Sequence, residues 1–572
     1  MRSLKGRRAT DLAVPLRAAL GRRQPVAAAL RRLQDQDCDL APVVEGRRAI
    51  GLMARSSLEA AARYRLESIP VSSLAGDAPR GLPWSAGHAK VLGALRGGAP
   101  GVIVRGPDGV PAGLIPRRLM DGAWERAGGA PPARVIAGRL RAGLPRELFK
   151  LLRRASRIAR ARGEALYLVG GVVRDLMSGG AGKDVDLVAA RDAGGLAREL
   201  AASTGGRVVT HPRFLTARVS LAGGARVDVA TARSETYAAP GGLPQVRPGS
   251  LEQDLERRDV SINAMAIRLD GAHFGVLVDP LGGMADLQQH VMRVHHALSL
   301  TEDPTRALRI GRLAARLGCR LAPQTSGSLA LAMGCGAFDR VSGERFMQEL
   351  RLVAAEPDPI AALRQVDRIG ALGAISSGMR VAPGARAAWR RLRPCDPDGP
   401  LASVRGMPAP DLLVALLCAD SAPAAVRRRI ARRLRLAGEP LRRFIEAPAT
   451  AARVLRALRA ETGLHRTAAR LEREPPEAIL LALSRDTSRS VAARALACLR
   501  FRALRPRVGG GDLARMGLDP GPQFGRILAA LRAARLSGRV TDVESELRLA
   551  RRLVSASLRR GASGTARART IR

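Results

Sequence analysis

Residues 168–188 read LVGGVVRDLMSGGAGKDVDLV, in which two apolar segments flank a glycine pair, a short helix-compatible segment with Arg174 and Asp175 in an apolar frame, and a glycine-rich turn. The apolar run that ends at Val169 predicts a buried strand, and the closing KDVDLV predicts a second one. Between them, Gly170 and Gly171 let backbone amides approach a phosphate at the start of the helix, where the helix dipole favours negative charge. The stretch therefore predicts a strand–turn–helix–strand unit that binds phosphate.

Two acidic residues lie at the start of the second strand. Asp184 and Asp186 are two positions apart, so both carboxylates leave the same face of the strand. Neighbouring carboxylates repel each other unless a cation lies between them, and Mg²⁺ is held by one or two carboxylates together with substrate phosphates. This layout is typical of metal-dependent phosphoryl or nucleotidyl transfer. An acidic pair or a glycine pair alone has an ordinary structural explanation, but their succession favours catalysis.

The pattern G-G-x-V-R-D followed by D-x-D resembles the signature of the class II tRNA nucleotidyltransferase and bacterial poly(A) polymerase family. The resemblance implies that Asp184 and Asp186 are catalytic and bind the metal. It also implies that Gly170, Gly171 and Arg174 hold the incoming triphosphate.

A third acid, Asp228, lies within the apolar strand-like segment RVDVA. An acid in such a strand is costly to bury without a cation or a partner. We expect the sheet to place Asp228 beside Asp184 and Asp186, as a metal ligand or as the base for the attacking hydroxyl. Members of the family carry an acid on the corresponding strand. The structural alternative is a side chain that faces solvent.

Residues 231–254 are polar, rich in glycine and proline, and poorly periodic, which predicts a mobile active-site loop.

The motif that follows, DLERRDVSINAMA, contains R-R-D-x-[ST]-I-N-A-M-A, which is also typical of the family. We expect Arg257, Arg258 and Asp259 to form a charge cluster at the start of a helix. Asn263 on the same helix would then reach the sugar or the phosphates of the nucleotide. Helix capping by Asp259 is the alternative, but it does not explain the two arginines followed by Asn263.

The segment TEDPTRALRIGR, residues 301–312, repeats arginine every three residues. Arg306, Arg309 and Arg312 share a phase with Asp303, so they lie along one side of a helix. Arginine binds base edges and phosphates, and aspartate accepts hydrogen bonds from exocyclic amines. In the family, E-D-x-x-R selects the nucleotide, which implies that Asp303 and Arg306 read the incoming base. Without the other motifs, Asp303 before a proline is an ordinary helix N-cap.

Composition agrees with a polyanionic partner. The chain has 95 Lys plus Arg against 51 Asp plus Glu, a net charge of +44, which suits RNA. Only four of the cations are lysines, so a GC-rich coding bias explains part of the excess. The six cysteines are scattered without a C-x-x-C pair, which excludes a zinc knuckle and indicates reduced thiols in the cytoplasm. No apolar run approaches transmembrane length, so we expect no membrane partner.

The sequence predicts a multidomain protein that combines α/β domains with an all-α part. The predicted domains are a CBS-like α/β pair at 1–126, a linker at 127–145, a mixed-sheet nucleotidyltransferase head at 146–275, a helical neck with the nucleotide-selecting helix at 276–365, an RNA-binding helical body and tail at 366–560, and a basic disordered tail at 561–572. Within the body, helices are predicted at 411–418, 424–436, 451–461, 476–483 and 491–504.

The first of these domains has two similar helix–strand–strand–helix halves. PVVE followed by GLMARSSL resembles a tandem CBS pair, and such pairs bind adenine nucleotides between their halves. The second half is degenerate, so a structural remnant and a dimerisation module stay open as alternatives.

These patterns predict a template-independent RNA nucleotidyltransferase. The 3′-hydroxyl of RNA, most simply the tRNA 3′ end, attacks the α-phosphate of ATP, or of CTP and then ATP, with Mg²⁺ as cofactor. One alternative keeps the chemistry and changes the product: a poly(A) polymerase on other RNAs, or an enzyme that adds only the terminal A. Another class is a non-catalytic RNA-binding regulator that senses adenine nucleotides through the N-terminal pair. Loss of the acids at 184 or 186 would mark such a regulator, and both are present.

Overall fold

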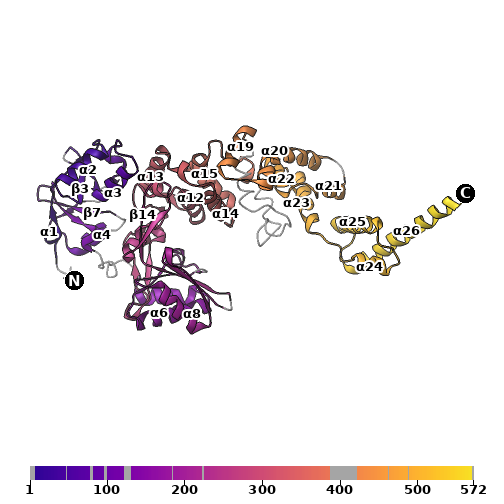
Figure 1. Cartoon of the computed structure of the whole chain (residues 1–572), viewed down its shortest axis with the longest axis horizontal. Helices are drawn as coiled ribbons and strands as arrows, with labels where there is room; N and C mark the ends of the chain where they lie inside the picture. Colours follow the sequence, from indigo (N-terminus) through magenta and orange to yellow (C-terminus); the bar gives the residue numbers. More distant parts are fainter. Residues whose placement is uncertain are drawn as a thin grey trace. The chain divides into compact units, whose positions relative to one another are not determined.

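The computed structural model of the chain falls into two compact units, which we call the first unit (residues 1–342) and the second unit (residues 343–572) (Figure 1). The structure describes residues 7–46, 48–77, 81–95, 99–120, 131–182, 185–221, 224–386, 422–460, 463–486 and 488–569. Each unit is described by itself.

A seven-stranded mixed sheet forms the centre of the first unit, in the order β11-β12-β13-β10-β9-β16-β17. Strands β10 and β13 are parallel, and the other neighbours are antiparallel. The strands are β9 (Leu166–Val169), β10 (Val185–Ala189), β11 (Arg207–His211), β12 (Thr216–Ser220), β13 (Arg226–Thr231), β16 (Ala266–Arg268) and β17 (Leu277–Val278). The glycine-rich motif therefore lies between two neighbouring central strands, as its sequence predicts.

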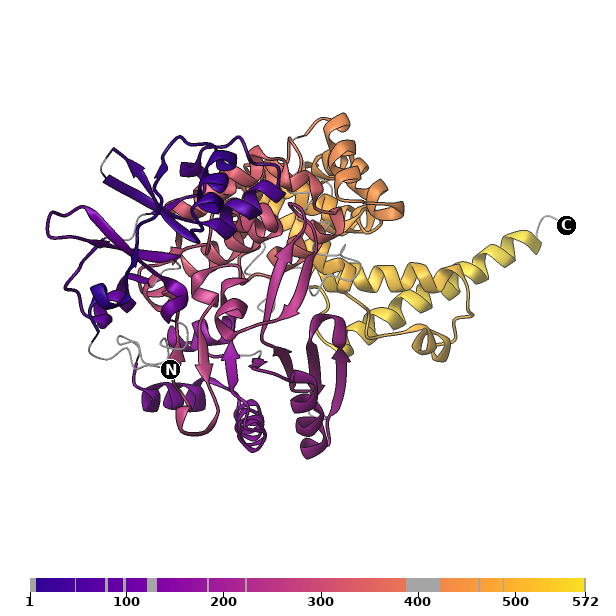
Figure 2. The ribbon, with the colours of Figure 1, turned by 60° about the vertical axis from the view of Figure 1, so that its left-hand side comes forward.

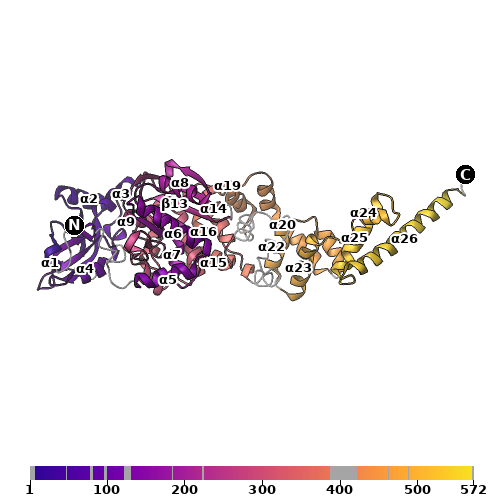
Figure 3. The same ribbon diagram turned by 90° about the horizontal axis from the view of Figure 1, so that it is seen from below.

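Helices cover one face of this sheet. They are α5 (Ala133–Gly143), α6 (Arg146–Ala161), α7 (Gly171–Met177) and α8 (Ala193–Thr204). Because alternate strand residues point to opposite faces, Leu166, Leu168 and Leu187 pack against these helices in one core. Figure 3 shows the four helices gathered over the sheet, and Figure 1 shows α6 beside α8.

Residues 7–120, here called the N-terminal layer, contain two four-stranded sheets built to one plan. In each, a short strand runs parallel to the first strand of an antiparallel hairpin, and a further short strand pairs with the second. The sheet orders are β2-β3-β4-β5 and β1-β8-β7-β6. The helices and strands are α1 (Ala9–Leu12), β1 (Val14–Pro15), β2 (Leu20–Gly21), α2 (Val26–Asp35), β3 (Leu40–Glu45), β4 (Arg48–Ala54), α3 (Arg55–Arg63), β5 (Gly76–Asp77), β6 (Leu82–Pro83), α4 (His88–Leu95), β7 (Gly101–Arg105) and β8 (Pro111–Pro116). The likeness of this repeat to a CBS pair stays a prediction.

The N-terminal layer shares its core with the central sheet. Val91 and Leu95 from α4 and Ile115 from β8 pack with Tyr167 and Val188, which lie on the sheet face opposite α5–α8. The sequence predicts a self-contained unit here. The structure differs, because the second half of the N-terminal layer buries its apolar side chains against β9 and β10, the strands on either side of the glycine-rich motif.

Residues 231–254 contain regular secondary structure, so the prediction of a stretch without strands or helices is wrong; its predicted mobility stays a prediction. They contain an antiparallel hairpin of β14 (Arg233–Tyr237) and β15 (Pro244–Pro248), followed by α9 (Leu251–Glu256). The side chains on one face of β14 are polar and bond to one another, so the strand lacks the alternation of apolar and polar residues. Glu235 accepts hydrogen bonds from the guanidinium of Arg233 at 3.2 Å and from the Tyr237 hydroxyl at 3.2 Å. A search for apolar periodicity misses such strands.

The RRD motif follows a helix instead of starting one, so this part of the prediction is also wrong. Helix α9 ends at Glu256, and Arg257 caps its C-terminal end, where the helix dipole favours a cation. Asn263 lies in the short 3-10 segment Ser261–Asn263.

The remaining elements of the first unit lead to the arginine-repeat helix. They are α10 (Gly283–Gln288), β18 (Val291–Met292), α11 (Ser299–Glu302), α12 (Thr305–Leu317), β19 (Arg320–Leu321) and α13 (Pro323–Gly334). Asp303 lies in the turn between α11 and α12.

The described part of the second unit is entirely helical. Its helices are α14 (Gly343–Ala354), α15 (Pro359–Arg368), α16 (Ala371–Ile375), α19 (Ala424–Arg433), α20 (Gly438–Arg459), α21 (Leu464–Leu471), α22 (Pro476–Arg485), α23 (Arg489–Ala503), α24 (Gly510–Arg515), α25 (Pro522–Leu536) and α26 (Val543–Arg569). The last two run side by side, in yellow in Figure 2. The predicted helix at 411–418 lies outside the described residues. Helix α26 continues through 561–569, where composition predicts disorder, because alanine and arginine favour helix.

Two further predictions concern cysteines and membranes. Among the described residues, Cys38, Cys319, Cys335 and Cys498 form no disulfide. No helix in the described ranges is both long and apolar enough to cross a membrane.

Candidate active site

Two acids lie next to each other on the open part of the central sheet. The parallel pairing of β10 with β13 sets Asp186 directly opposite Asp228. Both residues are on the face away from α5–α8, and neighbouring strands are about 4.8 Å apart. Asp186 is exposed and Asp228 is partly exposed. Asp184, the other predicted metal ligand, lies outside the described residues.

Arg218 on β12 faces Asp228 across the sheet. Its guanidinium binds both carboxylate oxygens, with Nε–Oδ1 at 2.7 Å and Nη2–Oδ2 at 2.9 Å. The hydrogen bond to Asp228 raises the pKa of Arg218, and the more distant charge of Asp186 adds to the rise. Both partners of the ion pair are about half exposed, at 55% and 47%. Such exposed pairs contribute roughly 0–1 kcal/mol, so a metal ion or a substrate can displace the guanidinium at little cost.

Gly170 lets charged groups converge next to Asp186. Its φ of +82° lies in the left-handed region that favours glycine. A Cβ at this position would lie 3.4 Å from Nη1 of Arg258 and 3.4 Å from Oδ2 of Asp186. The glycine therefore leaves room for the guanidinium and the carboxylate to approach the same turn.

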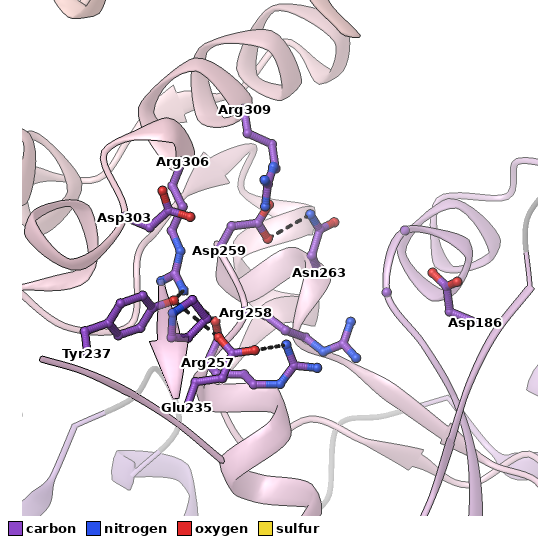
Figure 4. Close-up of a pocket in the computed structure, with 13 residues that line it drawn as sticks. Asp186, Glu235, Tyr237, Arg257, Arg258, Asp259, Asn263, Asp303, Arg306 and Arg309 are labelled. Carbon is purple, nitrogen blue, oxygen red and sulfur yellow. Dashed lines mark hydrogen bonds and ion pairs between the residues drawn. The ribbon is translucent and has the colours of Figure 1, made fainter. Parts of the chain in front are cut away.

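A cavity of about 360 Å³ opens beside this turn (Figure 4). Its size is within the range of small-ligand sites. The lining residues are Gly170, Gly171, Asp186, Glu235, Tyr237, Pro244, Arg257, Arg258, Asp259, Asn263, Asp303, Arg306 and Arg309. Four arginines and four carboxylates line this cavity, so it offers guanidinium donors for an anionic group beside carboxylate acceptors.

Two of these arginines are anchored by one buried acid. Asp254 on α9 is fully buried and accepts hydrogen bonds from Nη2 of Arg257 at 2.8 Å and from Nη2 of Arg258 at 2.9 Å. Burial by itself raises the pKa of Asp254, but the charges of Arg258 and Arg257 outweigh it and lower the pKa. The second arm of Arg257 reaches Glu235 at 2.9 Å. The two guanidiniums are thus fixed from behind while they face the cavity.

Arg306 and Asp303 form another part of the wall. The Arg306 guanidinium is 5% exposed and donates to the Tyr237 hydroxyl at 3.3 Å and to the Arg257 carbonyl at 2.8 Å. Asp303 precedes the N-cap residue Pro304 and accepts a hydrogen bond from the Thr305 amide at 3.1 Å. Burial opposes the charge of Arg306, but Tyr237 and Asp303 outweigh it, and its pKa is raised. Asp303 therefore braces the start of α12 and also lines the cavity.

Arg174, which the family resemblance predicts to hold the triphosphate, contacts Asn263 and Asp175. Its Nη1 donates to Oδ1 of Asn263 at 2.6 Å, and its Nε donates to Asp175 at 2.8 Å. Asn263 in turn donates to Asp259, whose carboxylate is 3.7 Å from Arg309. Arg174 is buried and does not line the cavity, so it supports Asn263 from behind, because its guanidinium is held by two polar partners.

The remaining differences between prediction and cavity are few. Arg312 is not among the lining residues either, since the three-residue spacing drifts around the helix. Glu235, Tyr237, Pro244 and Arg257 line the cavity but are absent from the predicted binding residues. The alternation of Arg233, Glu235 and Tyr237 in RSETY is the signal that reveals a strand here.

A second cavity, of about 350 Å³, lies on the other side of Asp186. It is lined by Val169, Asp186, Leu187, Val188, His211, Thr216, Ala217, Arg218, Asp228, Val229, Ala230, Arg257 and Arg258. The two cavities share Asp186, Arg257 and Arg258. Asp228 and Arg218 belong to the second one only.

The acids suit a hard divalent cation. Carboxylate oxygens are the ligands that Mg²⁺ prefers in proteins, and Asp186 and Asp228 present them side by side. Within the ranges that the structure describes, no group of three or more His, Cys, Asp or Glu residues converges on one point. The described residues thus supply two of the three predicted acids.

Comparison with known proteins gives consistent matches. Residues 166–293 match the poly(A) polymerase head domain. The A-adding tRNA nucleotidyltransferase of Geobacter sulfurreducens is 30% identical over 421 residues, which are 72% of this chain and 48% of that protein. The CC-adding tRNA nucleotidyltransferase of Deinococcus radiodurans is 41% identical over 208 residues, 36% of this chain and 54% of that protein.

A solved structure has the same fold over most of the chain. The Thermotoga maritima CCA-adding enzyme complexed with tRNA is similar with a TM-score of 0.55 and 26% identity, covering 74% of this chain and 98% of that one. The chain spans about half the length of the two sequence relatives. The matched head domain, the relatives and the shared fold together support the family that the motifs indicate: the chain is similar to the class II tRNA nucleotidyltransferases, the family of the CCA-adding enzymes.

Proposed function

We propose that the chain is a template-independent nucleotidyltransferase that adds CCA or the terminal A to tRNA 3′ ends. The observation that carries the proposal is the meeting of two cavities at Asp186. Transfer needs two substrates with their reacting atoms side by side. We assign the arginine-lined cavity to the incoming nucleotide and the second cavity, with Asp228 and Arg218, to the RNA end.

The chemistry follows from this assignment. The RNA 3′-oxygen forms a bond to the α-phosphorus, the bridging bond between the α- and β-phosphates breaks, and pyrophosphate leaves. Asp228 lies in the cavity of the RNA end and accepts the proton of the hydroxyl. Arg257 and Arg258, held by Asp254, border both cavities and stabilise the negative charge of the phosphates.

Enzymes of this family use divalent metal ions. We propose Mg²⁺ as the ion and Asp184, Asp186 and Asp228 as its ligands. When bound, Mg²⁺ lowers the pKa of the attacking hydroxyl and shields the charge of the leaving pyrophosphate. Removal of metal by EDTA should abolish incorporation, and added Mg²⁺ should restore it.

The base of the nucleotide is read by Asp303 and Arg306 in this proposal. One supplies an acceptor and the other a fork of donors, which together distinguish base edges. Gly170 and Gly171 border the triphosphate, with Asn263, Asp259 and Arg309 along the wall. The sequence predicts that Arg174 and Arg312 also bind the nucleotide; in the proposed site Arg174 acts through Asn263.

The helices of the second unit are proposed to contact the tRNA body. Helix α19 reads AAVRRRIARR, and Arg428, Arg429 and Arg432 are exposed on it. Arginines that neutralise phosphates make binding weaken steeply with salt. A fall of tRNA affinity on raising salt, reduced in an Arg428→Gln, Arg432→Gln variant, supports this contact.

The N-terminal layer has the repeated plan that the CBS-like prediction requires. We propose an adenine nucleotide as its ligand. Binding of AMP by the Asp186→Asn protein, competed equally by ADP, is the measurement that checks it.

The deciding experiment offers the protein tRNAs that lack the last one, two or three nucleotides, with each of the four nucleoside triphosphates. Addition of A alone, or of C, C and A in order, defines the product. The long match to an A-adding relative favours the terminal A. Asp186→Asn and Asp228→Asn should each lower incorporation at least roughly 100-fold, since lost metal coordination costs several kcal/mol. Both should keep tRNA binding, and unchanged incorporation by Asp186→Asn would refute the assignment.

A further inference from the structure

Tyr64 of the N-terminal layer reaches the segment that carries the nucleotide-selecting residues. It follows α3 and is 4% exposed. Its hydroxyl donates to Oε1 of Glu302 at 3.1 Å and lies 3.4 Å from the carbonyl oxygen of Tyr237. Glu302 immediately precedes Asp303, and Tyr237 is the partner of Arg306. One hydroxyl thus contacts two segments of the proposed nucleotide site.

Glu302 is held away from the nucleotide cavity. It is not among the lining residues, whereas Asp303 and Arg306 are. Its Oε2 lies 3.5 Å from Nε2 of His296, so the carboxylate is enclosed between the N-terminal layer and the segment before α11. The Glu302 side chain, held in this direction, therefore fixes the backbone of the turn between α11 and α12, from which Asp303 points into the cavity.

The hairpin provides a second connection. The Tyr237 hydroxyl binds Arg306 on the cavity side, while its carbonyl faces Tyr64. At the tip of the hairpin, the amide of Gly241 donates to the carbonyls of Thr301 and Glu302, each at 3.1 Å. Tyr64 lies where the hairpin and the turn between α11 and α12 meet.

Apolar packing supports the same junction. Tyr64 and Tyr237 belong to one core, together with Leu298 and the helices of the N-terminal layer. The core keeps the Tyr64 ring in place, so its hydroxyl has a fixed position from which to hold Glu302.

We propose that Tyr64 is a positioning residue for nucleotide selection. Its hydroxyl fixes Glu302 and Tyr237, and these in turn orient Asp303 and Arg306 toward the base. The N-terminal layer is then a part of the nucleotide site and not an appendage to it. This inference rests on the proposed function, because it concerns how well that function discriminates nucleotides.

The expected effect is on nucleotide binding more than on chemistry. Tyr64→Phe keeps the ring and removes the donor, so Glu302 is free to turn and the Asp303–Arg306 pair loses its fixed direction. We expect the KM for the correct nucleotide to rise roughly three- to tenfold, or by up to about 1.4 kcal/mol. The value of kcat should change less than about twofold, because Asp186 and Asp228 are not in this network, and misincorporation should increase.

A matched control separates positioning from stability. The Ser156 hydroxyl donates to the Leu269 carbonyl on the helix-covered face of the central sheet, and neither residue lines either of the two cavities. Ser156→Ala also loses one buried hydroxyl bond, so it should lower the Tm comparably and leave KM and fidelity unchanged.

The experiment measures KM and kcat for ATP and CTP with tRNA ends, and the Kd of ATP by equilibrium dialysis, in wild type, Tyr64→Phe and Ser156→Ala. A raised KM and Kd in Tyr64→Phe alone supports the proposal. Unchanged KM and Kd with a lowered Tm overturns it, and leaves the proposed function intact. If even wild type adds no nucleotide to any RNA, the proposed function fails, and the dialysis still decides whether Tyr64 shapes the ATP site.

Discussion

Replacing Asp254 by asparagine tests how the arginines of the site are held. The side chain is fully buried and accepts from Arg257 with Nε at 3.0 Å and Nη2 at 2.8 Å, and from Arg258 with Nη2 at 2.9 Å. Asparagine keeps the shape but removes the charge and turns an amide NH₂ toward one guanidinium. Breaking a buried ion pair from one side costs about 3–5 kcal/mol.

The lower end of this range applies, because Arg257 and Arg258 are 17% and 16% exposed and keep some hydration. About 3 kcal/mol corresponds to a fall in Tm of roughly 4 °C for a unit of this size. The measurement is thermal unfolding of the full chain followed by circular dichroism. The nucleotide KM should also rise, since both arginines border the nucleotide cavity.

The matched control is Glu45→Gln. Glu45 pairs with Arg22 at 2.9 Å, but the two side chains are 60% and 52% exposed. Solvent screening limits such a pair to roughly 0–1 kcal/mol. If Asp254→Asn melts within about 1 °C of the Glu45→Gln protein, the buried carboxylate does not hold the arginines, and the reasoning is refuted.

Three more predictions follow. Gly170→Ala puts a side chain at φ +82° and ψ −149°, a backbone conformation essentially restricted to glycine, which costs roughly 1–3 kcal/mol. The turn beside Asp186 should therefore shift, and incorporation assays should show a raised nucleotide KM; an unchanged KM would show that the site does not depend on this glycine conformation. Arg218→Gln frees Asp228 from an exposed pair, so the Mg²⁺ concentration for half-maximal activity should fall up to about fivefold, and a higher requirement would show that Arg218 assists metal binding. The pKa of Asp254 is lowered in the folded chain, so the stability that this carboxylate contributes is complete above its unfolded pKa of about 3.9 and is lost as pH falls through its folded pKa. Below about pH 4 the Tm of wild type should therefore drop more steeply than the Tm of Asp254→Asn. Parallel curves of Tm against pH would exclude this carboxylate as the cause of the drop.

The central part of the fold is predictable because local and long-range signals agree there. Apolar segments around Leu168 and Leu187 have strand length, and the glycine pair between them marks the turn into a helix. The spacing of Asp184 and Asp186 predicts a common face without any knowledge of partners; Asp184 itself lies outside the described residues. The neighbouring strand with Asp228 was expected beside them, and the structure sets Asp228 opposite Asp186.

The sequence does not show where a side chain points or which residue it bonds to. Arg174 lies in a motif that suggests phosphate binding, but the motif does not reveal that its guanidinium donates a hydrogen bond to Asn263. Glu235 and Tyr237 are in a polar hairpin, whose strands are held by ion pairs that no periodicity reveals. The contact of Tyr64 with Glu302 joins residues 238 positions apart in the chain.

The common core of α4 and β8 with the central sheet bears on how the protein is made. During synthesis the N-terminal layer emerges well before strand β17, which contributes Val278 to that core. Until then, Val91, Leu95 and Ile115 lack the surface that covers them. Non-local burial of this kind slows folding and leaves apolar surface open to aggregation. Expression of the complete chain, with chaperones present during translation, is therefore expected to yield more native protein than separate production of its pieces.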